Sequence, residues 1–306
     1  MIISWETLKV RIFCGIGDRK RDKNLTAPKG VTAVKNIPYA DGGKFNLLDI
    51  YYPQNTDGVL PAIVIVHGGG YVYGTKEAYF HYGMFLAGQG FTVVNFNYHL
   101  APEHKFPTQL KEINMVLEWM EKNFSRYHIN PDQVFLAGDS AGAQIASHYC
   151  TIYSNPEFAK MYDFKAPKQI HIRGVALNCG MYDITDAEEE NKKKKGTKTM
   201  GDLLDIYLGK NRDKLQNKLQ VLDYISSEFP PAFVMTSQYD ILREKAEPMY
   251  DLLKKRGVTA EYRIYGEEGQ TYMGHVFHLN MNLQEAEECN RDEAEFFRRQ
   301  ICSPAK

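Results

Sequence analysis

The chain has 306 residues, of which 43% are hydrophobic, 12% aromatic and 25% charged, and this is an ordinary globular composition. Its 37 basic and 38 acidic side chains give a formal net charge of −1. Because this balance implies no basic face, nucleic acid and an anionic membrane are not expected partners.

Five cysteines are scattered along the chain, at Cys14, Cys150, Cys179, Cys289 and Cys302. No two of them have the close spacing of a metal clip or a redox pair. We therefore expect reduced thiols, no metal site and a cytoplasmic protein.

The N-terminal residues 1–9 lack an apolar core followed by small cleavage residues, so they do not read as a secretory signal. The strongest apolar run, residues 60–66, is far too short to span a bilayer. Stable membrane insertion is therefore not expected.

Residues 1 to about 30 have a mixed composition and carry a basic cluster at 19–23. The charges favour a solvated N-terminal helix and linker. The alternative is that this segment folds over an active site as part of a cap.

Segments rich in β-formers begin at residue 31. Residues 31–39 and 45–52 flank Asp41-Gly42-Gly43, and this turn predicts an antiparallel hairpin that opens a sheet. Residues 61–66 follow as a continuous apolar run, which is typical of a strand covered on both faces.

Strands and amphipathic helices then alternate. Ile113, Val116, Leu117, Met120 and Phe124 recur at helical spacing and form one apolar stripe. Helices are predicted at 79–88, 111–124, 200–208, 247–256 and 283–301, and further strands at 91–96, 134–139, 170–177, 232–236 and 260–265. This alternation implies crossover connections and a mostly parallel sheet.

Residues 182–224 interrupt the alternation with an acidic patch at 188–190 and a lysine run at 192–195. The charge run is typical of a solvated loop, whereas the length of the insertion suits a lid over a site. Because no internal repeat or low-complexity linker is present, the whole chain, residues 1–306, is predicted to form a single domain. A small cap is expected from 1–30 and 182–224.

An apolar run ends in Gly138-Asp139-Ser140-Ala141-Gly142, and small residues that can start a helix follow. Side chains at the two glycines would collide with the adjoining strand and helix. The strained turn lifts the hydroxyl of Ser140 outward at a helix N-terminus, which makes Ser140 the candidate nucleophile. Asp139 adjoins it, but neighbouring side chains at such a turn point in different directions.

His67-Gly68-Gly69-Gly70 follows the buried strand, at the carboxyl edge where open α/β sheets bind their ligands. Successive glycines let backbone N–H groups face a ligand, and such donors stabilise the oxyanion of acyl transfer. A phosphate-binding loop is disfavoured, because neither a lysine-serine pair nor a spaced glycine fingerprint follows.

The base must be a histidine that can reach Ser140. His275 and His278 both follow the last predicted strand, and periodicity does not decide between them, although His275 is favoured. Asp240 follows the strand at 232–236 and is the candidate acid, with Asp183 as the main competitor. The order serine, aspartate, histidine along the chain is that of α/β-hydrolases.

From about Asn46 to its C-terminus, the sequence resembles the hormone-sensitive-lipase-like esterases of the α/β-hydrolase fold. Five motifs in the same order make this resemblance highly specific: His67-Gly68-Gly69-Gly70, Tyr98-His99-Leu100-Ala101-Pro102-Glu103, Gly138-Asp139-Ser140-Ala141-Gly142, Asp240-Ile241-Leu242-Arg243-Glu244 and His275-Val276-Phe277. The resemblance implies an α/β-hydrolase fold, with a central, mostly parallel eight-stranded sheet flanked by helices and a small cap.

The same resemblance assigns the catalytic roles. It places the nucleophile on Ser140, the acid on Asp240 and the base on His275 rather than His278. The family's oxyanion-hole donors fall on the backbone N–H groups of Gly69, Gly70 and Ala141.

Three positions depart from the family's pattern. His99 stands where arginine is usual, which puts a structural ion pair in doubt but not the chemistry. Ile241 replaces a common proline, and Glu244 replaces a common aspartate.

The expected activity is that of a serine carboxylesterase that forms an acyl-enzyme, acts on a small-molecule ester and needs no cofactor. Tyr71, Tyr73, Tyr79 and Phe80 lie near the glycine loop and favour short acyl chains such as acetyl, unless they only pack in the core. Tyr71 and Tyr73 are the candidate substrate contacts. Edges near the C-terminus are candidate surfaces for a homodimer.

Two rival functions are kept. One is an amide hydrolase, a peptidase or formamidase, that uses the same three residues. The other is a non-catalytic small-molecule receptor on the same fold, and the presence of Ser140, Asp240 and His275 argues against it.

Overall fold

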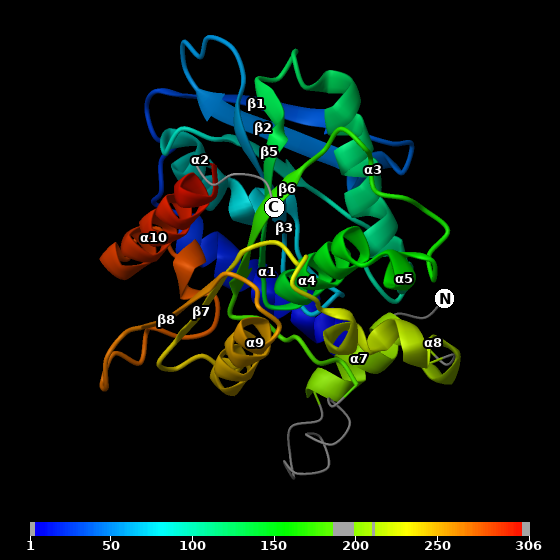
Figure 1. Ribbon diagram of the computed structural model, residues 1–306. Helices are drawn as coiled ribbons and strands as arrows, with labels where there is room; N and C mark the ends of the chain where they lie inside the picture. Colours follow the sequence, from blue (N-terminus) through cyan, green and yellow to red (C-terminus); the bar gives the residue numbers. More distant parts are fainter. Residues whose placement is uncertain (1–3, 186–198, 210–211, 302–306) are drawn as a thin grey trace.

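The computed structural model describes residues 4–185, 199–209 and 212–301, and its central element is an eight-stranded sheet (Figure 1). The strand order is β1-β2-β4-β3-β5-β6-β7-β8. β1 pairs antiparallel with β2 and β2 antiparallel with β4, and all other pairs are parallel. The predicted mostly parallel sheet is confirmed. Its strands are β1 (Val31–Pro38), β2 (Leu47–Pro53), β3 (Leu60–Val66), β4 (Thr92–Phe96), β5 (Ile129–Asp139), β6 (Ile172–Asn178), β7 (Ala232–Ser237) and β8 (Ala260–Tyr265).

Strand β3 is buried on both faces, as its continuous apolar run predicts. Ala62, Val64 and Val66 belong to one hydrophobic core. Ile63 and Ile65 belong to a second core on the opposite face. The alternation follows from the two-residue period of a strand, and it divides the interior into two layers that the sheet separates.

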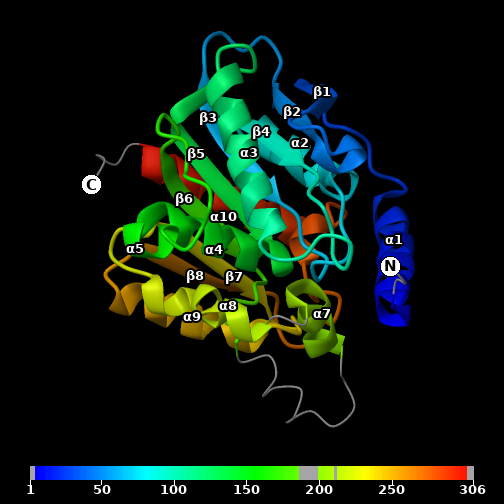
Figure 2. The ribbon, with the colours of Figure 1, turned by 90° about the vertical axis from the view of Figure 1, so that its right-hand side faces the viewer.

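Helices cover both faces of the sheet, and Figure 2 shows α3 and α4 in front of it with α10 behind. The apolar stripe predicted for α3 is confirmed for Ile113, Val116, Leu117 and Met120, which are fully buried, but Phe124 follows the end of the helix and is 36% exposed. The first core takes side chains from α3 (Thr108–Asn123), α4 (Ala141–Ser154) and α9 (Arg243–Lys255), and the second from α2 (Phe80–Gly88) and α10 (Gln284–Ile301). The remaining helices are α1 (Trp5–Asp22), α5 (Pro156–Ala159), α7 (Thr199–Leu208) and α8 (Arg212–Leu219).

The hairpin that opens the sheet has a longer connection than its sequence predicts. Phe45 lies in a 3-10 turn at Gly43–Asn46 and not in the second strand. The side chain of Asn46 accepts a hydrogen bond from the N–H of Gly42 at 2.7 Å and donates to Glu112 of α3 at 2.8 Å. These contacts hold the turn against the body of the protein and delay the start of β2.

Helix α9 begins at Arg243, four residues before its predicted start near Glu247. The turn that leads into it is set by Asp240, whose carboxylate accepts from the N–H of Leu242 at 2.9 Å. The backbone carbonyl of Asp240 accepts from the N–H of Arg243 at 3.1 Å. The helix therefore starts directly beside a predicted site residue.

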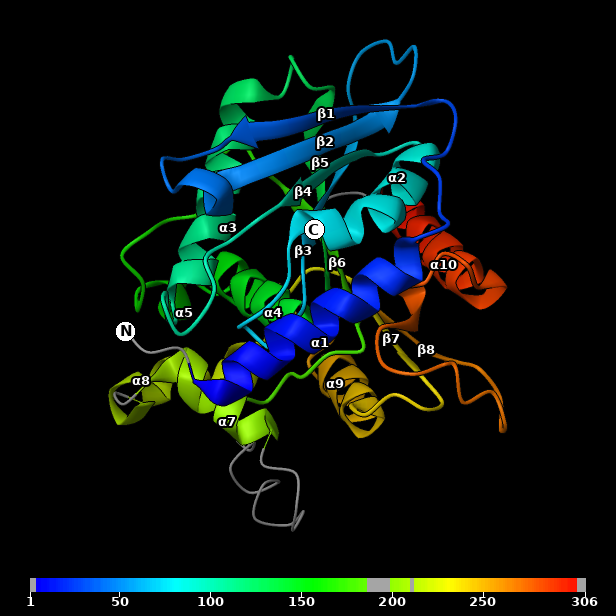
Figure 3. The ribbon, with the colours of Figure 1, turned by 180° about the vertical axis from the view of Figure 1, so that it is seen from behind.

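Helix α1 lies across the molecule in Figure 3, over the carboxyl edge of the central strands. Arg11 fixes it to the body through the carbonyls of Val72 and Ala101 and two oxygens of Glu103. The predicted solvated helix is therefore wrong for one side of α1, which packs against the protein. The acidic patch at 188–190 and the lysine run at 192–195 lie outside the described residues.

Within the described ranges, no helix combines the length and the apolar character needed to cross a membrane.

Candidate active site

The turn between β5 and α4 has the strained backbone that its sequence predicts. Ser140 adopts φ 52° and ψ −119° directly before α4. A Cβ atom on Gly142 would lie 2.1 Å from the carbonyl oxygen of Val66, and one on Gly138 would lie 2.4 Å from the carbonyl oxygen of Gly142. Any larger residue would push strand and helix apart, so the glycines are what allow the turn to close.

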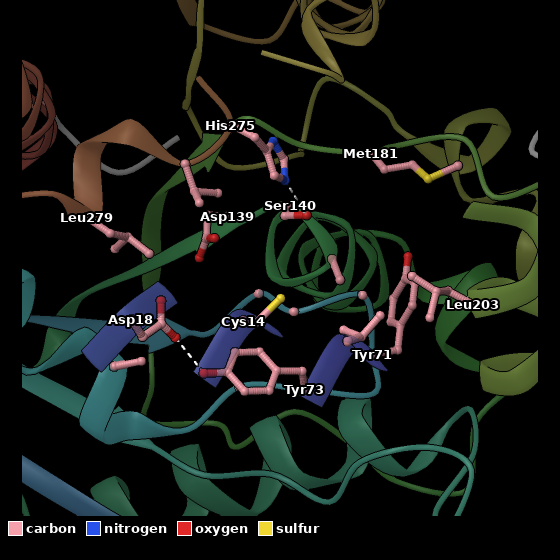
Figure 4. A pocket seen from close by; sticks show the side chains of 18 of the residues that line it. Cys14, Asp18, Tyr71, Tyr73, Asp139, Ser140, Met181, Leu203, His275 and Leu279 are labelled. Carbon is pink, nitrogen blue, oxygen red and sulfur yellow. Dashed lines mark hydrogen bonds between the residues drawn. The ribbon is translucent and has the colours of Figure 1, made fainter. Parts of the chain in front are cut away.

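Hydrogen bonds join Ser140, His275 and Asp240 in one chain (Figure 4). The Oγ of Ser140 lies 2.9 Å from Nε2 of His275. The Nδ1 of His275 lies 2.6 Å from Oδ1 of Asp240. Because a carboxylate only accepts, Nδ1 carries the proton, and Nε2 is left to accept from the serine hydroxyl.

Asp240 is held in its ionised form. Burial by itself raises the pKa of this carboxyl group, but hydrogen bonds from His275, the N–H of Leu242 and the thiol of Cys179, with the charge of His275, hold the pKa below its ordinary value. Oδ2 also accepts from the hydroxyl of Thr236 at 2.9 Å. The side chain of Asp240 is 0% exposed and that of His275 is 23% exposed, so the histidine is the member of the pair that solvent can reach.

Cys179 is a site residue that the sequence analysis missed. It follows β6 with a left-handed φ of 48°, and its N–H donates to the carbonyl of Met235 at 2.8 Å. Burial, with the negative charge of Asp240, raises the pKa of the Cys179 thiol well above its ordinary value. The thiol therefore keeps its proton. Sγ lies 3.9 Å from Sδ of Met235, and the thiol also contributes to the lowered pKa of Asp240.

Cys179, Asp240 and His275 also have metal-ligating atoms within 4.8 Å of one another. A soft cation would need the thiolate and a free imidazole nitrogen. Here the thiol is protonated, and both ring nitrogens of His275 already have hydrogen-bond partners. The arrangement is accounted for as a hydrogen-bond network.

The glycine loop after β3 lines the same cavity as Ser140. Gly69 has φ 110° and Gly70 has φ 59°, which side chains would strain. A Cβ atom on Gly69 would lie 2.3 Å from the carbonyl oxygen of Tyr73. The first residue of α4, Ala141, also lines the cavity, so the three predicted oxyanion donors surround one space with the serine.

Asp139 supports this loop from behind. Its carboxylate accepts a 2.6 Å hydrogen bond from the hydroxyl of Tyr79, which in turn accepts one from the N–H of Gly68 at 2.7 Å. Burial raises the pKa of Asp139 to about 6. Among the described residues, the hydrogen-bond partner of Nδ1 of His275 is Asp240 and not Asp139, in agreement with the exclusion of Asp139 as the acid.

The cavity has a volume of about 290 Å³ and opens over Ser140. Figure 4 shows Tyr71 and Tyr73 on the wall opposite His275, with Cys14 between them and the serine. Tyr71 stacks on Tyr207 of α7 with ring centroids 4.0 Å apart. The hydroxyl of Tyr73 donates to Asp18 of α1 at 2.6 Å. Both candidate contacts are thus pocket-lining residues that also anchor neighbouring helices.

Phe80 does not line this cavity, which corrects its grouping with the pocket aromatics. Its ring packs edge-on against Tyr51, with Nζ of Lys35 3.9 Å from the ring centroid. Phe80 is the first residue of α2, and the helix turns it toward β2 and away from the glycine loop.

The alternatives for base and acid lie elsewhere. His278 is fully buried, with its ring edge-on to Tyr82 at 5.3 Å, and burial lowers its pKa to about 3. The carboxylate of Asp183 accepts hydrogen bonds from the N–H and the hydroxyl of Thr185. Neither residue lines the cavity over Ser140.

His99, which replaces the family's usual arginine, still meets an acidic partner. Its Nδ1 lies 2.5 Å from Oε1 of Glu112, and its backbone N–H donates to Oε2 at 2.8 Å. The contact joins the loop after β4 to helix α3 and lies outside the serine cavity.

The order of the strands in the sheet, the turn that carries Ser140 and the loop that carries His275 together define an α/β-hydrolase fold. A family model described as alpha/beta hydrolase fold matches residues 63–279. The chain belongs to this family, that of the hormone-sensitive-lipase-like esterases, and the resemblance drawn from its motifs is confirmed.

Known proteins agree with this assignment. Esterase LipQ of Mycobacterium tuberculosis is 25% identical over 244 residues, which cover 78% of this chain and 54% of the relative. The chain thus spans about half the length of this curated relative. A crystal structure of esterase B from Lactobacillus rhamnosis superposes with a TM-score of 0.86 at 22% identity, covering 97% of both chains. A hyperthermophilic esterase from Pyrobaculum calidifontis superposes with a TM-score of 0.75 at 26% identity, covering 97% of this chain and 92% of that chain.

Proposed function

We propose that this protein is a serine carboxylesterase that hydrolyses short-chain acyl esters of the acetyl type. The observation that carries the proposal is the unbroken chain of hydrogen bonds from Asp240 through His275 to Ser140, which ends in a cavity. Membership of an esterase family and the esterase names of several relatives support it.

In the acylation half, Nε2 of His275 takes the proton from Ser140 as Oγ attacks the ester carbonyl. Asp240 stabilises the imidazolium that forms. Backbone N–H groups of Gly69, Gly70 and Ala141 receive the oxyanion, and loss of one such donor typically costs roughly 3 kcal/mol of barrier. Collapse of the intermediate expels the alcohol, which takes its proton from His275.

In the deacylation half, His275 removes a proton from water, which attacks the acyl carbon bound to Ser140. The same donors stabilise the second tetrahedral intermediate. Its collapse breaks the bond to Oγ of Ser140, which takes the proton back from His275 as the carboxylic acid leaves. No step needs a redox or metal centre, because proton transfer and charge stabilisation account for each bond made and broken.

The preference for short acyl chains rests on the cavity. Its volume is about 290 Å³. Tyr71 is buried and stacked, and Tyr73 is tied to Asp18, so neither ring is free to swing aside for a longer chain. Met181 and Leu203 add apolar surface, which suits a small alkyl group.

A substrate panel tests both reaction and size. We expect turnover of p-nitrophenyl acetate and butyrate, a fall of at least about tenfold in kcat/KM by octanoate, and far slower turnover of p-nitroacetanilide. The reason is that each further methylene must displace packed aromatic side chains. The measurement is the release of nitrophenol or nitroaniline.

A maximum beyond octanoate would refute the short-chain preference. Faster turnover of the anilide would instead favour the amide hydrolase. A Tyr73→Ala variant is the matched test of the wall, because removing this ring should extend the accepted chain length while leaving acetate turnover within a few-fold.

Cys179 provides a further prediction. We expect Cys179→Ala to lower kcat/KM for p-nitrophenyl acetate about tenfold and to raise the pH at which activity appears on the acid limb, because Asp240 loses a donor to its ionised form. Cys179→Ser keeps a donor and should retain most activity. The measurement is the pH profile of kcat/KM.

Cys150→Ala is the matched control, since Cys150 is equally buried but lies on α4 in the first core. Equal losses in Cys179→Ala and Cys179→Ser, with no shift of the acid limb, would mean that Cys179 only fills space.

We also propose that α1 and α7 form the small cap of a single domain, since Val10 and Cys14 of α1 and Leu203 of α7 line the cavity. Cys14, Cys150, Cys179 and Cys289 are all free thiols, which supports a reducing, cytoplasmic compartment. The homodimer stays a prediction.

A further inference from the structure

The outer side of helix α1 is apolar, and no described part of the chain covers it. Five of the eleven large hydrophobic side chains exposed in the described residues lie on this one helix: Trp5 (65%), Leu8 (40%), Ile12 (47%), Phe13 (70%) and Ile16 (52%). Positions 5, 8, 12 and 16 repeat at helical spacing and form a stripe. Such a concentration marks an interaction surface.

The stripe is not what holds the helix in place. The opposite side of α1 does this, since Val10, Cys14 and Asp18 line the catalytic cavity and Arg11 bonds to the body. Figure 3 shows the helix crossing the outside of the molecule. Its outer side is therefore unpartnered in the described part of the chain.

Basic side chains continue the stripe toward the end of the helix, where Arg19, Lys20 and Lys23 are exposed. The two carboxylates nearby are engaged elsewhere. Asp18 bonds to Tyr73 and to Arg21, and Asp22 also bonds to Arg21. Apolar and cationic groups thus share one surface, although the whole chain has a net charge of only −1.

A second copy of the chain fits this surface poorly. A stable dimer buries about 800 Å² on each partner, whereas two partly exposed aromatic rings and three aliphatic side chains offer roughly half of that. A lipid surface needs no such area, and it accepts an apolar stripe together with cations when its headgroups are anionic.

We propose that the outer face of α1, defined by Trp5, Leu8, Ile12, Phe13 and Ile16 with Arg19, Lys20 and Lys23, docks the protein on an anionic phospholipid bilayer. The apolar side chains enter the boundary between headgroups and acyl chains, and the cations meet the phosphates. The helix lies in the plane of the surface and does not span it.

The chain carries its own reporter for this contact. Trp5 and Trp119 are its two tryptophans, and Trp119 packs on Tyr127 of the loop after α3. In a Trp119→Phe variant, the emission of Trp5 alone is recorded with vesicles of phosphatidylcholine, with and without one-third phosphatidylglycerol. We expect a blue shift and co-sedimentation only with the anionic vesicles, weakened several-fold by 0.5 M salt.

Introduced into the Trp119→Phe variant, Phe13→Glu should lower partitioning into the anionic vesicles at least about tenfold. Lys20→Glu should lower it by about tenfold or more, because each cation near an anionic surface strengthens binding about fivefold. Val59→Glu is the matched control: Val59 is 45% exposed but precedes β3 at the opposite edge of the sheet. It should bind like the parent protein.

No binding to the anionic vesicles, equal binding to neutral ones, or undiminished binding of Phe13→Glu would overturn the proposal. The proposal would also be overturned if the emission of Trp5 were blue-shifted without lipid while light scattering gave twice the mass of one chain. The outer face of α1 would then be covered by a second copy of the protein. Binding is read without turnover, so this result is independent of ester hydrolysis, which soluble p-nitrophenyl acetate reports separately.

Discussion

Ser140→Ala is expected to abolish ester hydrolysis, with a loss of about 10⁶-fold in kcat, as for removal of a nucleophile that acts in concert with its base. Only Oγ is lost, and its hydrogen-bond partner is the 23% exposed ring of His275. The folded structure should therefore persist. The measurements are kcat/KM for p-nitrophenyl acetate, labelling by a fluorophosphonate, and thermal unfolding.

Ser147→Ala is a control on the same helix. Ser147 is buried in α4, and its hydroxyl has no hydrogen-bond partner within the described structure, so its removal should leave activity and labelling intact. Turnover or labelling retained by Ser140→Ala would contradict the proposed mechanism, and a wild-type protein that fails to label would favour the receptor.

Asp240→Asn is expected to lower kcat by about 10⁴-fold. The amide of asparagine can present N–H to Nδ1 of His275, which then becomes the acceptor and places its proton on Nε2. That nitrogen lies 2.9 Å from Oγ of Ser140 and could no longer act as the base. The measurement is kcat at saturating p-nitrophenyl acetate.

The matched control is Asp183→Asn, at the other aspartate that the sequence offers. The oxygen of asparagine can still accept from the N–H of Thr185, as the carboxylate of Asp183 does at 2.8 Å. Activity should be unchanged. Comparable losses in both variants would mean that the acid had been assigned to the wrong strand loop.

The architecture was predictable wherever local pattern and burial agree. The continuous apolar run from Ile63 to Val66 is typical of a strand that is covered on both faces, and both faces are buried. The apolar positions of α3 recur at the period of a helix, and they form its buried side. The hairpin turn was misjudged because Asn46 is held by Glu112, a partner 66 residues away that no local rule includes.

In the candidate site, too, some residues could be predicted from the local sequence and others could not. Ser140 and the glycine loop sit in short motifs whose steric purpose can be read directly, whereas the choice of His275 over His278 needed the family's pattern. Cys179 gave no signal, because its contact with Asp240 exists only after two separate strands pair side by side. The sequence offered residues 1–30 as part of a cap but did not show which side chains of α1 face the pocket, because their partners follow β3.

Helix α1 precedes the first strand, yet it supplies part of the wall that faces Ser140. It joins the body mainly through side chains, with Arg11 on the carbonyl of Val72 and Arg21 on that of Ala78. The groups proposed to break the ester bond belong to strand loops. One part of the pocket wall is therefore encoded apart from the proposed catalytic residues, so changes in α1 can alter that part of the wall while Ser140, Asp240 and His275 stay the same.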